Sequence, residues 1–158
     1  SRSFCPAFKT SYMILPPELL SMWKRGHAYY YALTPKIEQF ALAEFLNKGY
    51  FTKHYKAMRR IYKEKRELLK ECLTYAFGDR IILQDRHGST YITAEIQGLP
   101  ANEIIQLARQ SGVKLFSMNS FNVSPKNTIK NDKLVIGIGD LSREKIKLGV
   151  QLIHRSII

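Results

Sequence analysis

The sequence has 158 residues, of which 45% are hydrophobic and 11% aromatic, so it describes about one folded domain rather than a disordered tail. Its formal net charge of +12 favours anionic partners but does not decide the fold. Two cysteines, Cys5 and Cys72, are too few for a disulfide scaffold, no run is apolar enough to span a bilayer, and the N-terminus does not resemble a signal peptide. We therefore expect a soluble, cytoplasmic protein.

The N-terminal segment begins abruptly. An apolar run at residues 12–15 is typical of a strand, and no start signal precedes it, so we expect the cut end of a longer chain. Pro16 and Pro17 end this run, and Glu18 then lies in a predicted first helical turn, where a carboxylate suits the helix dipole.

Two further helices follow. Thr34 and Pro35 predict a helix start, with a hydroxyl cap and a proline at the first helical position, and residues 47–49 predict its end. A longer helix is predicted over residues 51–77, ended by Gly78. Its apolar stripe has helical spacing and consists of Phe51, Tyr55, Met58, Tyr62, Leu69, Cys72 and Leu73.

The remaining sequence changes character and alternates strands with helices. The predicted elements are strands at 80–85 and 90–97, a helix at 100–110, a strand at 113–116, a loop at 117–132, a strand at 133–138 and a last helix capped by Ser142. This order predicts an α+β fold, in which helices pack on a small, mainly antiparallel sheet. We expect residues 1–158 to form one domain, with helices in 16–77 and the sheet and its helices in 78–158.

The long predicted helix is strongly basic. Glu64, Glu67 and Glu71 are its only acids, against a set of cations made up of Lys53, Lys56, Arg59, Arg60, Lys63, Lys65, Arg66 and Lys70. One interpretation is a face that contacts phosphates. The favoured one is a solvated outer face with ion pairs one turn apart, because the cations spread round much of the circumference outside the apolar stripe and no known nucleic-acid motif is present.

No catalytic or metal-binding set stands out. The four histidines, His27, His54, His87 and His154, are isolated, and none has a carboxylate or cysteine at ligand spacing, so we expect no metal site. Gly137 and Gly139 end a strand, but a phosphate-binding loop needs glycines that open a helix after a strand.

Three segments together resemble MocR-type regulators, which belong to the GntR superfamily and join a winged-helix DNA-binding domain to an aminotransferase-like domain. They are PAFKTSYMILPPELL (6–20), EQFALAEFLNKGYFTKHYKAMRRIYKEKRELL (38–69) and LVIGIGDLSREKIKLGVQLI (134–153). The resemblance covers nearly the whole chain in the order of the family's C-terminal third. It implies the small C-terminal domain of the pyridoxal-phosphate-dependent transferase fold. Residues 1–15 would then be a remnant of the large-domain strand region, and the winged helix and large domain would lie upstream.

The resemblance also assigns residues, and here the chain departs from the family. Arg2 stands at the position of the lysine that forms the Schiff base with pyridoxal phosphate, and an arginine stays protonated and cannot do so. Lys9 stands where the family's arginine meets the cofactor phosphate, and it keeps the charge without the bidentate fork. Val135 stands where aminotransferases hold the arginine that binds the substrate carboxylate.

These observations leave three hypotheses for function. The first is the effector and dimerisation subdomain of a MocR-type regulator, which would not catalyse a reaction alone and would bind DNA only through its absent N-terminal domain. This resemblance implies pyridoxal phosphate in the full-length protein but not on this fragment, a homodimer, and an amino-acid-like effector. The second is the small domain of a working aminotransferase, and the third is a free-standing basic nucleic-acid-binding module.

Overall fold

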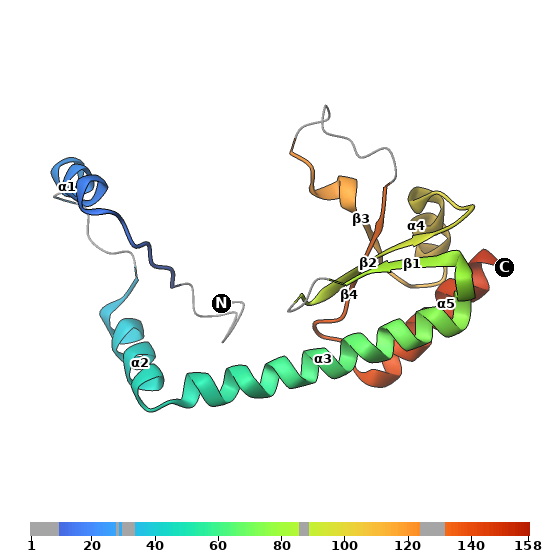
Figure 1. Cartoon of the computed structure of the whole chain (residues 1–158), viewed down its shortest axis with the longest axis horizontal. Helices are drawn as coiled ribbons and strands as arrows, with labels where there is room; N and C mark the ends of the chain where they lie inside the picture. The colour runs from blue at the N-terminus through green and yellow to red at the C-terminus, as the bar shows by residue number, and fades with distance from the viewer. Residues whose placement is uncertain (1–9, 28, 30–33, 86–88, 124–131) are drawn as a thin grey trace. The chain divides into compact units, whose positions relative to one another are not determined.

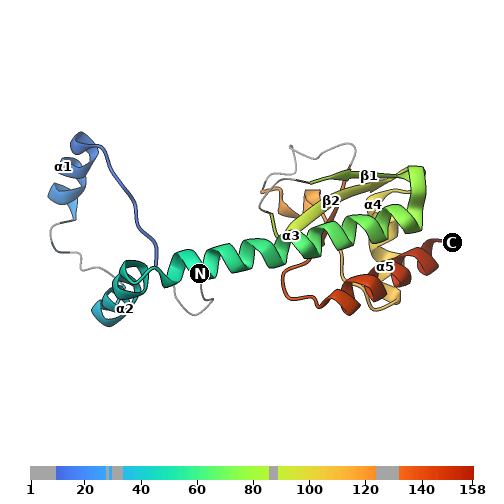
Figure 2. The same ribbon diagram turned by 60° about the horizontal axis from the view of Figure 1, so that its bottom comes forward.

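The computed structural model describes residues 10–27, 29, 34–85, 89–123 and 132–158. The chain divides into two compact units, residues 1–58 and 59–158, and α3 contributes to both. Figures 1 and 2 show the elements from two directions.

The first unit is helical. It contains α1 (Pro17–Gly26), α2 (Lys36–Asn47) and the beginning of α3 (Tyr50–Phe77). Pro17 lies in the first turn of α1, as predicted, and Glu18 follows it. Gly49 separates α2 from α3 with a φ of 74°, a conformation that costs glycine little. No described residue of this unit is buried.

Two expectations for this unit are wrong. The predicted strand at residues 12–15 is irregular backbone, with exposed side chains at residues 12–14, because no strand of the described residues pairs with it. The hydroxyl of Thr34 does not cap α2, whose N-cap is Pro35 without a side-chain hydrogen bond. The carbonyl oxygen of Thr34 instead accepts a hydrogen bond of 2.8 Å from Nε2 of Gln39.

The second unit is a four-stranded antiparallel sheet with the order β1-β2-β4-β3. Its elements after α3 are η1 (Gly78–Arg80), β1 (Ile81–Gln84), β2 (Tyr91–Ile96), α4 (Ala101–Gln110), β3 (Phe116–Ser117), η2 (Met118–Phe121), β4 (Leu134–Gly137) and α5 (Arg143–Ile157). The predicted α+β class is confirmed. The third strand begins at Phe116 rather than at Val113, because only Phe116 and Ser117 find partners on β4, and η2 occupies part of the predicted loop.

One face of the sheet carries the core. Residues alternate along β2 and β4, so that Ile92, Ala94 and Ile96 point to the same side as Leu134 and Ile136. This face packs against the buried apolar residues of the helices, which are Leu69, Leu73 and Phe77 of α3, Ala101, Ile104 and Ala108 of α4, and Ile146, Val150 and Ile153 of α5. Both views show α5 alongside the second half of α3 (Figures 1 and 2).

Two local signals from the sequence place these helices correctly. The side chain of Ser142 accepts a hydrogen bond of 3.2 Å from the backbone N–H of Lys145, as expected of an N-cap residue. Gly78 ends α3 with a φ of 56°, which allows the chain to turn into β1.

Candidate functional site

The two predicted cofactor-binding residues, Arg2 and Lys9, lie outside the described residues. Val135, the third position assigned by the resemblance, is on β4 and points to the sheet face opposite the helices. It pairs with Thr93 of β2 and with Phe116 of β3, and only 8% of it is exposed. A buried valine between these neighbours offers no cation to a carboxylate.

The surface around Val135 is apolar and aromatic. The rings of Phe116 and Phe121 lie 6.1 Å apart, and Nζ of Lys114 lies 5.1 Å from the centroid of the Phe116 ring. We call Thr93, Lys114, Phe116, Phe121 and Val135 the Val135 surface. Among these five residues Lys114 alone is charged, and the rings of Phe116 and Phe121 are exposed.

A buried charged network fixes α3 against the turn between β1 and β2. Arg66 is 6% exposed, and its Nε lies 3.4 Å from Oδ1 of Asp85 without the alignment of a hydrogen bond. Its Nη1 donates a bond of 3.3 Å to the backbone oxygen of Ser89. Nζ of Lys70 lies 3.5 Å from Oδ2 of Asp85 and 2.9 Å from Glu67. The hydrogen bond to Glu67, with the charges of Glu67 and Asp85, raises the pKa of Lys70 above its ordinary value, so Lys70 stays charged at neutral pH.

A second contact fixes α3 at another loop, because Nζ of Lys65 donates a hydrogen bond of 3.1 Å to the backbone oxygen of Gly139. The expectation of a solvated basic face is therefore wrong for Lys65 and Arg66, whereas the expected ion pair one turn apart is present between Lys70 and Glu67. For Arg66 the signal was in the sequence, because it stands three residues before Leu69 and so continues the buried stripe of α3.

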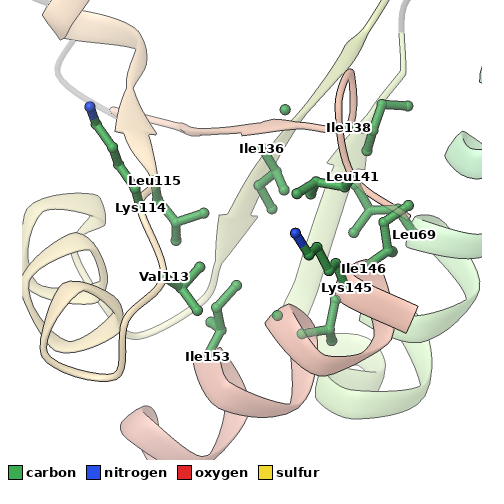
Figure 3. A pocket seen from close by; sticks show the side chains of 13 residues that line it. Leu69, Val113, Lys114, Leu115, Ile136, Ile138, Leu141, Lys145, Ile146 and Ile153 are labelled. Atoms are coloured by element: carbon green, nitrogen blue, oxygen red, sulfur yellow. The ribbon is translucent and has the colours of Figure 1, made fainter. Parts of the chain in front are cut away.

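An apolar pocket lies inside the second unit (Figure 3). Side chains of β4, of α5 and of the segment before β3 converge on it, among them Val113, Leu115, Ile136, Ile146 and Ile153. Its volume of about 60 Å³ is far below the roughly 300 Å³ at which ligand pockets begin. We regard it as a gap in core packing, not as a binding site.

The histidines have structural environments where they are described. His27 stacks on Trp23 with ring centroids 5.2 Å apart, and His154 lies edge-on to Phe77 at 5.4 Å. His87 lies outside the described residues. Within the described ranges, no group of three or more His, Cys, Asp or Glu side chains could hold a metal ion. No helix in these ranges is long and apolar enough to cross a membrane.

Comparison with solved structures defines the fold. The chain superposes on LysN, an α-aminoadipate aminotransferase of Thermus thermophilus solved with N-(5'-phosphopyridoxyl)-L-leucine, with a TM-score of 0.71 and 24% identity, over 91% of this chain and 36% of that one. For the multiple substrate aminotransferase of Thermococcus profundus the TM-score is 0.73 and the identity 18%, over 89% and 34%. The chain therefore has the α+β fold of the small domain of pyridoxal-phosphate-dependent aminotransferases.

Sequence comparison identifies regulators instead. The chain is 31% identical to the HTH-type transcriptional regulator YhdI of Bacillus subtilis over 96% of its own length. It is 24% identical to MocR of Rhizobium meliloti, a probable rhizopine catabolism regulatory protein, over 70%. It spans 32% and 22% of these two relatives. No protein-family model matches the chain. The resemblance to MocR-type regulators is confirmed: the chain is a domain of the aminotransferase fold that is homologous to these proteins.

Proposed function

We propose that this chain is the C-terminal lobe of a cytoplasmic MocR-type transcriptional regulator, and that it responds to a ligand rather than catalyses a reaction. The observation that supports this most directly is the pairing of the two comparisons, since the fold is that of aminotransferases while the sequence relatives are helix–turn–helix regulators. In the parent protein the lobe would close one side of an effector cleft. DNA would be bound by a helix–turn–helix domain elsewhere in that protein.

The chemistry at the assigned positions favours a regulator over a working aminotransferase. Val135 offers no charge for a substrate carboxylate, and Arg2 provides no amine for a Schiff base. Lys9 would still attract the phosphate of pyridoxal phosphate through its charge. We propose that the parent forms no covalent bond to this cofactor from the Arg2 position.

The exposed apolar side chains of the first unit support a lobe that packs against other parts of a larger protein. Trp23 of α1 is 43% exposed, and Ile37 and Phe40 of α2 are 78% and 73% exposed. Apolar surface of this kind marks interaction sites in soluble proteins. We propose that α1 and α2 contact the rest of the parent chain and its partner in a homodimer.

The test uses the full-length parent with added pyridoxal phosphate, and records visible absorbance before and after borohydride reduction. We expect that reduction attaches no cofactor to a lysine of this lobe. Cofactor attached by reduction to a peptide of residues 1–15 would contradict the assignment of Arg2. In parallel, operator binding is measured with and without candidate effectors, and an absence of any operator binding would refute the regulator itself.

A further inference from the structure

We propose that the first half of α3 carries a surface that contacts the phosphate backbone of double-stranded DNA. This surface, the basic face, consists of Lys53, Lys56, Arg59, Arg60 and Lys63. The choice of DNA as the anion rests on the proposed regulatory function. The experiment below tests this lobe alone, so that its failure would leave the regulator proposal standing.

The helix gathers these charges on one side. At 100° per residue, the five cations fall within an arc of about 120°. All eight cations of α3 taken together cover a wider arc. Lys53 and Lys63 stand ten residues apart, which corresponds to a row about 15 Å long. A row of this length spans about four phosphates of one DNA strand.

Among the described residues, acidic side chains meet the basic face at its C-terminal end, where Glu64, Glu67 and Glu71 line one hollow with Arg60 and Lys63. All five cations are exposed, and residues 50–63 contain no acid. Among the described residues, the only ion pair of the five joins Nε of Arg60 to Glu64 at 3.9 Å, and both side chains are more than half exposed. An exposed pair at that distance contributes little and leaves Arg60 available to an anion.

The cations in the second half of the same helix differ from those of the basic face, because they are bound within the fold. Lys65 bonds to Gly139, Arg66 to Ser89 and Asp85, and Lys70 to Glu67 and Asp85. Those three cations fix the fold, whereas the five before Glu64 do nothing for the second unit's core. Exposed positive charge along one side of a helix is a favourable arrangement for sequence-independent contact with phosphates.

The experiment measures binding of the 158-residue chain to a fluorescent 30-base-pair duplex of arbitrary sequence, by anisotropy across a series of salt concentrations. The test variant is Lys53→Gln, Lys56→Gln, Arg60→Gln and Lys63→Gln together, which lowers the net charge from +12 to +8 by removing four cations. Glutamine has a helix propensity close to that of lysine and arginine, so α3 should persist. Circular dichroism melts verify the fold of each variant.

The matched control removes the same charge elsewhere, through Arg109→Gln, Lys145→Gln, Lys147→Gln and Arg155→Gln, all at exposed positions. We expect the test variant to bind about tenfold or more weakly and to flatten the slope of log K against log salt by about 3 to 4. The control should keep most of the affinity and most of the salt slope of the unmodified chain. Equal losses in the two variants, or no duplex binding by the unmodified chain at low salt, would overturn the proposal. So would binding to anionic phospholipid vesicles without binding to the duplex.

Discussion

The two halves of α3 place the same kind of residue in opposite roles. The first half, residues 50–64, has no buried side chain. In the second half, residues 65–77, Leu69 and Leu73 are at most 2% exposed and Arg66 is buried with them. Both halves are rich in lysine and arginine. What separates them is whether a sheet and another helix lie against the stripe.

This difference teaches how to interpret charge in a fold of this kind. A cation beside packed elements is drawn into ion pairs and carbonyl contacts, as Lys65 and Arg66 are. A cation on an unpacked half keeps its charge available for a partner. The first unit thus offers exposed side chains to a partner, whereas the second unit contains its own buried core.

The largest expected effect separates the halves by burial. Leu73→Ala should lower the free energy of unfolding of the second unit by about 2 to 5 kcal/mol, because it removes a side chain that is 1% exposed and leaves a cavity. Tyr55→Ala, at a position that is 49% exposed in the first half, should cost less than about 1 kcal/mol. Urea denaturation followed by circular dichroism measures both. Equal losses would erase the distinction between the halves.

The buried ion pair gives the next effect. Arg66→Met should destabilise the second unit by about 3 kcal/mol, because Asp85 remains buried and keeps only Lys70 as a partner. The double variant Arg66→Met with Asp85→Leu should recover part of that loss, since no unpaired carboxylate remains. Arg59→Met, on the exposed half, should change stability by less than about 0.5 kcal/mol. If the double variant were less stable to unfolding than Arg66→Met, the attraction between Arg66 and Asp85 would exceed the cost of removing both charges from water.

A stabilising change sharpens the comparison from the other direction. Gly149→Ala should raise the stability of the second unit by about 1 kcal/mol, because alanine has the higher helix propensity and a Cβ at this position meets no atom within 4 Å. Gly149 also lines the small apolar pocket, so the added methyl begins to fill it. Gly112→Ala is the control and should destabilise, since its φ of 81° is unfavourable for alanine. Thermal melts of both variants decide the signs.

Much of the fold was accessible from the sequence, and the misses have physical causes. Helix α3, the strand pair β1 and β2, and the Ser142 cap were predicted because each depends on local periodicity or capping. The strand at residues 12–15 was wrong because a strand needs a hydrogen-bonding neighbour, which local pattern cannot reveal. The burial of Arg66 could have been predicted from its helical spacing to Leu69, but its ion-pair partner could not, because Asp85 lies nineteen residues away. The site could be predicted at Val135 only through the resemblance, and the assignments of Arg2 and Lys9 stay predictions.

The smallest expected effect tests the cap that the sequence predicted and the structure lacks. Thr34→Ala should leave α2 unchanged within about 0.3 kcal/mol, because the hydroxyl of Thr34 makes no cap bond and its backbone oxygen still accepts from Gln39 after the substitution. Ser142→Ala is the matched change at a working cap and should weaken the first turn of α5 by about 1 kcal/mol. Amide hydrogen exchange of residues 37–40 and 144–147 resolves the two turns separately. Faster exchange at residues 37–40 in Thr34→Ala would mean that the hydroxyl caps α2 in solution, and that local sequence signals govern the first unit more than its exposed helices suggest.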